Sequence, residues 1–321
     1  MRRAKIIARP FHKFFNLGEK QQIGEIDWSL PHQVFDKLDG SMVHPAMLGG
    51  EMVMMTRMGV TEQSRKAATH AGAGALELSR HLVDSGITPI FEFTSPDNRI
   101  VVAYDRPALT LLAAREMISG AYLSSAELAR LAAQFDVPLV RSLGSLSDVK
   151  SFVAKARGEE GIEGYVIAFE TGHRVKLKTE GYVLRHKALA GLQYEKNVLA
   201  WVATDAVDDV VPILSPELAA AVLAYRDQVN SSAVKLVAMI DAFLTANRDL
   251  SRKDFALKAN AELDQRVRGA AFRALDGKSP AEAITQLLQA STGSDTRVEG
   301  IRDLFHMSWQ VEGLALPEME G

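Results

Sequence analysis

The chain has 321 residues, of which 47% are hydrophobic and 24% are charged, with a formal net charge of −3 and no cysteine. These values exclude disulfides, thiolate metal sites and cysteine nucleophiles, and they predict an ordinary globular, cytoplasmic protein that is long enough for two domains. No apolar run reaches the roughly 18 residues of a membrane span. The best candidate, AVKLVAMIDAFL, is interrupted by Lys235 and Asp241.

In chain order, the first part of the sequence mixes alternating apolar runs with segments of helical spacing. Strands are expected where β-branched and aromatic residues alternate with polar ones between turn signals. The predicted strands are residues 4–10, 33–40, 51–59 and both arms of a hairpin over 164–179. Two further apolar segments, 88–104 and 108–123, are separated by the turn signal SPDN. Helices are predicted over 61–86, with Thr61 as the N-cap and Gly86 at the end, and over the capped segment 124–136.

After about residue 188 the sequence becomes rich in alanine and leucine, with a period near 3.6 and repeated serine caps. Helices are predicted over residues 186–203, 215–249, 251–263 and 279–291. The sequence therefore predicts a mixed α and β domain over residues 1–187 and an all-helical domain over residues 188–321.

The segment KLDGSM, residues 37–42, has two interpretations. Asp-Gly between β-prone runs is typical of a hairpin turn, because both residues tolerate positive φ. Alternatively, Lys37 is a nucleophile. The bare pattern K-x-D-G is too common by chance to decide between the two, so the rest of the chain must do so.

Four further fragments accompany KLDGS in order along the chain. They are RPFHKFFNLGE upstream, then FEFTSPDNRIVVAY, EGYVIAF and RVKLK downstream. With these motifs, residues 5–187 resemble the covalent lysine nucleotidyltransferases, the superfamily of ATP-dependent ligases and capping enzymes, and within it the type-1 RNA ligases of T-even phages. The resemblance implies an α+β fold, a nucleotidyltransferase (ATP-grasp-like ligase) domain of antiparallel sheets flanked by helices, joined here to the all-helical C-terminal domain.

A lysine attacks the α-phosphorus of ATP only as the neutral amine, and at an ordinary pKa of about 10.4 very few lysines are neutral near pH 7. Nearby cations and partial desolvation lower that pKa. Lys176 and Lys178 lie two apart in RVKLK, so a strand would place both on one face. There they would favour the neutral amine of Lys37 and neutralise charge on the α-phosphate. The alternative is a solvent-facing strand.

Glu92 in FEF and Glu163 in EGYVI lie beside apolar residues on predicted strands. A single such carboxylate is usually the outward-facing residue of an alternating strand. Together with Asp39, however, they are oxygen ligands suited to Mg²⁺, which takes one or two carboxylates with waters and phosphates. The resemblance implies that Glu92 contacts the adenosine ribose, that Glu163 holds Mg²⁺ or Mn²⁺, and that Asp39 serves the end-joining steps. Gly40 would let the backbone approach the nucleotide.

Further residues are assigned to the nucleotide by the resemblance alone. Lys13 would reach the triphosphate, Phe15 would pack beneath the nucleotide or in the core, and Arg57 would match a basic residue between two ligase motifs. The family also carries an arginine-containing strand before the segment ARP. Three alternatives are open: Arg2 or Arg3 substitutes for its arginine, the strand is absent, or the strand lies outside this chain.

The motifs together predict an ATP-dependent RNA ligase. AMP would pass from ATP to Lys37 and then to a 5′-phosphate RNA end, which a 3′-hydroxyl end would attack. The expected partners are ATP and RNA with these ends, with no membrane and no obligate protein partner. The alternatives are a DNA ligase or a capping guanylyltransferase, which usually append a β-barrel, and a non-catalytic RNA-end-binding protein on the same fold.

The helical domain carries none of the five motifs, so it is predicted to select the RNA substrate. Basic side chains along one helix face would contact the RNA backbone. The candidates are Arg252, Lys253, Lys258, Arg266, Arg268 and Arg273. The alternative is an ordinary solvated helix face.

Overall fold

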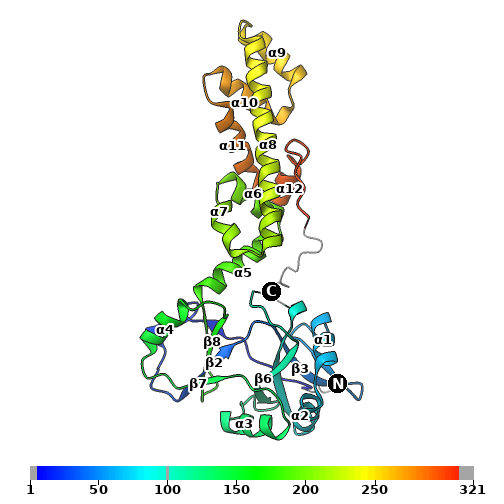
Figure 1. Ribbon diagram of the computed structural model, residues 1–321, viewed down its shortest axis with the longest axis vertical. Helices are drawn as coiled ribbons and strands as arrows, with labels where there is room; N and C mark the ends of the chain where they lie inside the picture. The colour runs from blue at the N-terminus through cyan, green and yellow to red at the C-terminus, as the bar shows by residue number, and fades with distance from the viewer. Residues whose placement is uncertain (1–5, 99–100, 311–321) are drawn as a thin grey trace, which may run out of the picture. The chain divides into compact units, whose positions relative to one another are not determined.

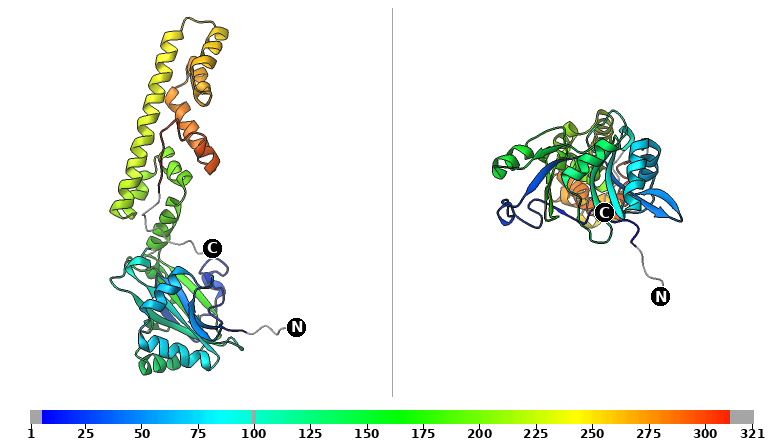
Figure 2. Two further views of the ribbon diagram at one scale, coloured as in Figure 1. Left: turned by 90° about the vertical axis from the view of Figure 1, so that its right-hand side faces the viewer. Right: turned by 90° about the horizontal axis from the view of Figure 1, so that it is seen from below.

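The computed structural model describes residues 6–98 and 101–310, and the chain divides into two compact units, residues 1–186 and residues 187–316 (Figure 1, Figure 2). The candidate arginines Arg2 and Arg3 lie outside the described residues. The assignment of catalysis and RNA selection to the two predicted domains stays a prediction.

The first unit is built on two sheets. The five-stranded sheet has the order β1-β9-β8-β2-β7 and is antiparallel except at its edge, where β1 and β9 run parallel. The four-stranded sheet has the order β4-β3-β5-β6 and is antiparallel throughout. The strands are β1 (Phe15–Asn16), β2 (His32–Lys37), β3 (Ser41–Leu48), β4 (Glu51–Met55), β5 (Ile87–Thr94), β6 (Ala108–Glu116), β7 (Ser142–Gly144), β8 (Gly164–Phe169) and β9 (Arg174–Lys178). Apart from the parallel edge pair, the predicted α+β fold is confirmed.

Each sheet buries one face beneath helices. The helix α4 packs on the five-stranded sheet over a core that includes Val34, Ile167 and Val175. The helices α1, α2 and α3 pack on the four-stranded sheet over a core that includes Phe91 and Phe93. These helices are α1 (Glu62–His70), α2 (Ala73–Asp84), α3 (Ser125–Gln134) and α4 (Val149–Arg157). Because side chains alternate along a strand, the residues between these core positions face the other way.

The segment after Lys37 joins the two sheets. β2 pairs with β7 and β8, whereas β3 pairs with β4 and β5. The two strands on either side of KLDGSM therefore do not pair with each other, and the hairpin interpretation is wrong. The chain instead carries the candidate nucleophile from one sheet directly into the other.

Some predicted elements differ from the structure. Residues 6–10 form no strand. The predicted helix over 61–86 is two helices, because the chain is extended at Ala71 and Gly72, while Thr61 caps α1 as expected by accepting a hydrogen bond from the Ser64 N–H at 3.3 Å. In the apolar segment 88–104 the strand ends at Thr94, and the turn signal SPDN forms a 3₁₀ turn at Pro96–Asn98, as the sequence predicts.

The second unit is helical, as the sequence predicts. Its elements are the end of α5 (Glu180–Leu192), α6 (Glu195–Ala203), α7 (Val207–Val210), α8 (Pro216–Asn247), α9 (Arg252–Glu262), α10 (Gln265–Leu275), α11 (Pro280–Ser291) and α12 (Asp295–Glu299). Ser215, Ser251 and Ser279 cap α8, α9 and α11, so the predicted serine caps are confirmed. The long helix α8 carries the core of this unit, with Val222, Val229 and residues further along one face packed on α6, α10 and α11.

By length and composition alone, α8 could cross a membrane. The helix continues through Lys235 and Asp241, the residues that interrupt the apolar run in the sequence. Its buried side chains recur every three or four residues, as in a helix that packs on one side against its neighbours.

Candidate active site

Lys37 lies in a row of residues that crosses three neighbouring strands. Lys37 pairs with Gly164 of β8, and Gly164 pairs with Lys178 of β9. Directly paired residues point to the same face of a sheet, so both lysines lie on one face with the glycine between them. Gly164 has a φ of +143°, and a Cβ there would lie 2.0 Å from the Leu177 carbonyl oxygen, so no larger residue fits between the lysines.

One carboxylate oxygen of Glu163 contacts both lysines. Its Oε1 lies 2.8 Å from Nζ of Lys37 and 2.9 Å from Nζ of Lys178. The Glu163 side chain is 3% exposed, whereas those of Lys37 and Lys178 are 21% and 24% exposed. The carboxylate is therefore fixed in the protein while both amines can still meet a ligand. In this arrangement the Lys37 amine forms an ion pair with Glu163. To attack a phosphorus atom, it must leave this ion pair.

Lys176 lies on the same face of β9 as Lys178, as their spacing predicts. Val175 and Leu177 alternate with them and are buried in the core on the opposite face. The Lys178 ammonium lies 4.8 Å from the centroid of the Tyr182 ring, and the Lys176 ammonium lies 5.0 Å from that of Phe14. Cation–π contacts with these rings thus stabilise both ammonium groups without neutralising their charge.

Asp39 is almost completely buried, at 1% exposure, and its carboxylate is fully engaged. One oxygen accepts hydrogen bonds from the backbone N–H groups of Val101 and Val102, both at 2.7 Å. The other accepts from the Tyr182 hydroxyl at 2.7 Å, while the Asp39 N–H donates to the Tyr104 hydroxyl at 2.9 Å. The side chain therefore ties two distant segments to the turn that follows Lys37.

Sequence reasoning missed the two tyrosines at this turn. Burial raises the pKa of the Tyr104 hydroxyl to about 12, and the charge of Asp39 acts in the same direction. Burial, followed by the charges of Glu163 and Asp39, raises the pKa of Tyr182 far above its ordinary value. Both hydroxyls therefore stay protonated and can donate. Tyr104 is the last residue of the motif FEFTSPDNRIVVAY and Tyr182 lies four residues beyond the motif RVKLK, but nothing in the spacing links either to Asp39.

Glu92 of β5 reaches the same turn from the other sheet. Its Oε1 accepts a hydrogen bond from the Gly40 N–H at 3.1 Å, and the side chain is 8% exposed. A Cβ on Gly40 would lie 2.3 Å from the Phe93 carbonyl oxygen, so a side chain at this position would push the turn away from β5. The structure thus brings six predicted site residues to one place: Lys37, Asp39, Gly40, Glu92, Glu163 and Lys178.

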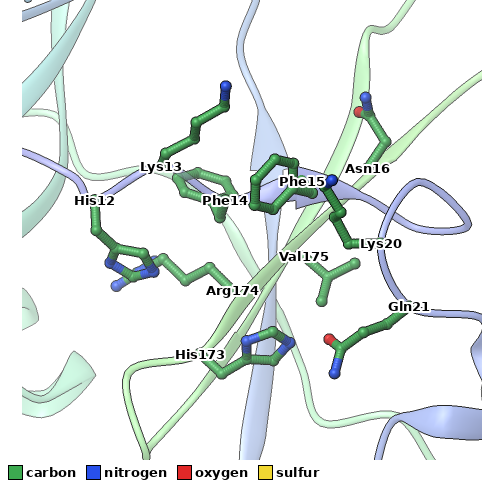
Figure 3. A pocket seen from close by; sticks show the side chains of 10 residues that line it. All are labelled: His12, Lys13, Phe14, Phe15, Asn16, Lys20, Gln21, His173, Arg174 and Val175. Atoms are coloured by element: carbon green, nitrogen blue, oxygen red, sulfur yellow. The ribbon is translucent and has the colours of Figure 1, made fainter.

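Lys13, Phe15 and Arg57 occupy other positions. Lys13 lies with its ammonium 5.5 Å from the centroid of the Phe15 ring, and both line a pocket of about 200 Å³ at the edge strand β1 (Figure 3). Phe15 pairs with Val175, so it points to the opposite face from Lys176 and Lys178. Arg57 is exposed in the tight turn between Thr56 and Gly59. The nucleotide roles of these three residues stay predictions.

Within residues 6–98 and 101–310, no three acidic or histidine side chains gather in the manner of a metal site. Glu163 is instead a single buried carboxylate between two lysines. A magnesium ion that is shared with substrate phosphates and waters needs only one or two protein carboxylates, so Glu163 fits such an ion. The donor set does not fit a metal held by protein groups alone.

In the helical unit, five of the six basic residues predicted to contact RNA bind neighbours in their own unit, among them Lys258, whose ammonium lies 3.9 Å from the Glu262 carboxylate. Arg252 forms an ion pair with Asp276 at 2.7 Å, and Arg266 pairs with both Asp264 and Asp303. The side chain of Arg268 donates to backbone carbonyls and that of Arg273 donates to a glutamine. These contacts favour the interpretation of a largely structural helix surface over that of a dedicated RNA-binding face.

Comparison with known protein sequences gives a match over the first unit. The profile of a family described as RNA ligase matches residues 1–189. A putative RNA ligase of Thermovibrio ammonificans is 30% identical over 206 residues, which are 60% of this chain and 52% of the relative. RNA ligase 1 of bacteriophage TS2126 is 28% identical over 228 residues, 65% of this chain and 55% of the relative. The chain spans about half the length of these two relatives.

Solved structures of two RNA ligases superpose on part of the chain. An archaeal ATP-dependent RNA ligase superposes with a TM-score of 0.46 at 22% identity, covering 58% of this chain and 52% of that one. A Naegleria gruberi RNA ligase variant with ATP and Mn superposes with a TM-score of 0.40 at 19% identity, covering 49% of this chain and 52% of that one.

Proposed function

The chain belongs to the RNA ligase family, and on that premise we propose that it is an ATP-dependent RNA ligase that joins a 5′-phosphate end to a 3′-hydroxyl end. The observation that carries the proposal is the placement of Lys37 and Lys178 on one buried carboxylate, Glu163, at the junction of two sheets. Phosphoryl transfer to a lysine needs a nucleophilic amine and a second cation that stabilises charge on the phosphate. Here both groups contact the same fixed carboxylate.

In the first step the neutral Lys37 amine attacks the α-phosphorus of ATP. A nitrogen–phosphorus bond forms, the bond from the α-phosphorus to the bridging oxygen breaks, and pyrophosphate leaves. Before the attack the Lys37 ammonium gives one proton to water and leaves its ion pair with Glu163, which keeps its contact with Lys178. The nitrogen gives a second proton to water when the nitrogen–phosphorus bond has formed. Lys178, with Lys176 on the same face of β9, stabilises the negative charge that develops on the phosphate oxygens.

The turn after Lys37 holds the nucleotide in this proposal. Gly40 brings its backbone close to β5, and Glu92, which already accepts from the Gly40 N–H, would bind the ribose hydroxyls beside it. Asp39 keeps the turn in place through its bonds to Tyr182 and the backbone of residues 101–102. Asp39 would serve the end-joining steps from this same position beside Lys37.

In the second step the phosphate of an RNA 5′ end attacks the AMP phosphorus and releases the Lys37 amine. In the third step an RNA 3′-hydroxyl attacks the activated end, a phosphodiester forms and AMP leaves. A bound Mg²⁺ or Mn²⁺ would neutralise part of the phosphate charge, and Glu163 is the residue that would hold it, directly or through water.

Mass spectrometry of the protein after incubation with ATP tests the proposal. We expect an AMP adduct on the peptide that contains Lys37, and its transfer to an RNA with a 5′-phosphate. A GMP adduct formed from GTP would point to a capping enzyme, and transfer to DNA in preference to RNA would point to a DNA ligase. A protein that binds RNA ends but carries no adduct would be a non-catalytic binder, and the proposal would fail.

A further inference from the structure

Asn98 is a buried residue of the motif FEFTSPDNRIVVAY to which the proposed reaction assigns no role. It ends the 3₁₀ turn that follows β5, and only 7% of the residue is exposed. Its backbone N–H donates to the carbonyl oxygen of Ser95 at 3.1 Å and to the hydroxyl of the same serine at 3.0 Å. The backbone at Asn98 is therefore fixed, and its side chain is held within the protein.

The side-chain amide of Asn98 connects β3 to β5. Its Nδ2 donates to the Phe93 carbonyl oxygen at 2.8 Å, and its Oδ1 accepts from the Ser41 hydroxyl at 3.2 Å. Ser41 and Phe93 are also partners in the pairing of β3 with β5. A primary amide can donate to a carbonyl and accept from a hydroxyl at the same time, whereas a carboxylate can only accept. Asparagine therefore suits this position, and aspartate does not.

The two groups that Asn98 binds lie next to Gly40. Ser41 is the following residue in the chain, and the Phe93 carbonyl oxygen is the atom that a Cβ on Gly40 would approach to 2.3 Å. The Gly40 N–H in turn donates to Oε1 of Glu92 at 3.1 Å. One buried amide thus holds together the close backbone contact and the carboxylate that form the ribose side of the proposed nucleotide site.

The phosphate side of that site belongs to the other sheet. Lys37 and Lys178 end β2 and β9, and Glu163, which contacts both amines, immediately precedes β8. The Asn98 side chain instead binds the start of β3 and the end of β5, which are strands of the four-stranded sheet. A change at Asn98 should therefore affect recognition of the sugar more directly than it affects the phosphate.

We propose that Asn98 is a positioning residue that sets the preference of the site for ribose over deoxyribose. It keeps Gly40 against β5, and so keeps Glu92 where that carboxylate accepts a hydrogen bond from a ribose hydroxyl. The proposal rests on the proposed function, which assigns the ribose to Glu92. A site that is built to bind a hydroxyl rejects the analogue that lacks it, because a buried polar group is then left unpaired.

The test measures equilibrium binding of three nucleotides to the full chain by isothermal titration calorimetry. The probes are α,β-methylene-ATP and its 2′-deoxy and 3′-deoxy forms, in which a carbon replaces the bridging oxygen, so that AMP cannot be transferred. The original protein should bind the ribonucleotide most tightly. In Asn98→Ala its preference over the more weakly bound deoxy form should fall about two- to tenfold, the loss expected of one hydrogen bond. Asn98→Asp, which removes the donor at nearly constant size, should behave in the same way.

A second pair of variants leaves Asn98 in place. Ser41→Ala removes the hydroxyl that donates to the amide and should also lower the preference, whereas Ser41→Thr, which keeps a hydroxyl, should retain it. The matched control is Asn247→Ala in the helical unit. Asn247 is likewise buried, and its Nδ2 donates to the Phe243 carbonyl oxygen at 2.7 Å, so the same kind of bond is lost far along the chain. This control should leave the preference unchanged.

An unchanged preference in the folded Asn98 and Ser41 variants would overturn the proposal, as would the lack of any ribose preference in the original protein. An equal loss of affinity for all three nucleotides would also overturn it, because Asn98 would then support the site as a whole and not the ribose contact. Since the probes cannot react, a protein that forms no lysyl-AMP from ATP but shows the expected changes in binding would contradict the proposed reaction and not the role of Asn98.

Discussion

At the scale of single residues, the Glu163 carboxylate organises the site because one buried oxygen contacts the amines of both Lys37 and Lys178. Removal of either cation leaves the other paired, whereas removal of the carboxylate leaves two neighbouring ammonium groups without an anion. The three substitutions should therefore differ in how they fail. Loss of Lys37 should abolish adduct formation, and loss of Lys178 should slow it. Loss of Glu163 should slow it and also disturb the positions of the two lysines.

Lys37→Ala should abolish transfer of label from α-labelled ATP to the protein, because no other amine occupies its position at the end of β2. Lys37→Arg should fail equally, since a guanidinium has a pKa above about 12 and supplies essentially no neutral nucleophile. The measurement is labelled protein after gel electrophoresis. Lys66→Ala, which removes a partly buried lysine paired with Glu62, is the matched control and should label normally. Comparable labelling of a Lys37 variant would remove the central claim.

Glu163→Ala and Lys178→Ala should each slow formation of the adduct by about 100-fold or more, the usual cost of removing one electrostatic stabiliser from an active site. Single-turnover rates with labelled ATP measure this loss. Extra Mg²⁺ should partly restore the rate of Glu163→Ala only if that carboxylate holds the ion. Normal rates in both variants would mean that the α-phosphate binds elsewhere.

Tyr182→Phe should slow the reaction without removing any group that touches ATP. The change deletes the hydroxyl that donates to Asp39 at 2.7 Å and leaves a buried carboxylate oxygen unsatisfied, which costs about 1–3 kcal/mol. We expect a lower rate of adduct formation and a lower urea midpoint in the same variant. Tyr194→Phe, at an exposed position in the helical unit, should change neither. A normal rate in Tyr182→Phe would show that Asp39 does not depend on this bond.

At the scale of elements, the segment after Lys37 matters because it connects two sheets. Its tight approach to β5 depends on Gly40, whose absent Cβ would lie 2.3 Å from the Phe93 carbonyl oxygen. Gly40→Ala should therefore lower the free energy of unfolding by roughly 1–3 kcal/mol, as overpacking usually does, and weaken adduct formation by moving the turn. Urea unfolding followed by circular dichroism measures the first effect. Gly24→Ala, where a Cβ would meet nothing within 4 Å, is the control.

The sequence predicts elements well where the pattern is local. The caps at Thr61 and Ser279 and the strands around Glu92 and Glu163 have their signals within a few residues. Pairing between strands is not local, so Asp-Gly after β2 resembled a hairpin although β3 belongs to another sheet. The short strands β1 and β7 were missed because two or three residues are too few to show alternation.

The same limit applies to the site. The five motifs identified the charged residues of the site and the glycine that its backbone needs. Lysine, glutamate and glycine rarely occur in this order by chance, so the order itself is informative. The tyrosines at positions 104 and 182 were missed because they act on Asp39 from 65 and 143 residues away. A hydroxyl that fixes another side chain has no sequence pattern of its own. Only the fold brings it to its partner.

At the scale of the whole molecule, the question is how the two units divide the reaction. The residues brought together around Lys37 all belong to residues 1–186, and the family profile ends at residue 189. The helical unit has its own core along α8, and most of its predicted RNA contacts are ion pairs or hydrogen bonds within the unit. Each unit thus has a core of its own, and the first contains the residues to which we assign the proposed first chemical step.

A chain that ends after Leu192, where α5 is complete, should therefore still form the Lys37 adduct. It should join RNA ends more weakly or less selectively than the full chain, with the largest loss for structured RNA, if the helical unit selects the substrate. Labelling with α-labelled ATP and joining of labelled RNA, measured on the same preparation, separate the two effects. Circular dichroism first establishes that the shortened chain is folded. A folded chain that cannot form the adduct would mean that the helical unit contributes to the nucleotide site, and the proposed division between the units would then be wrong.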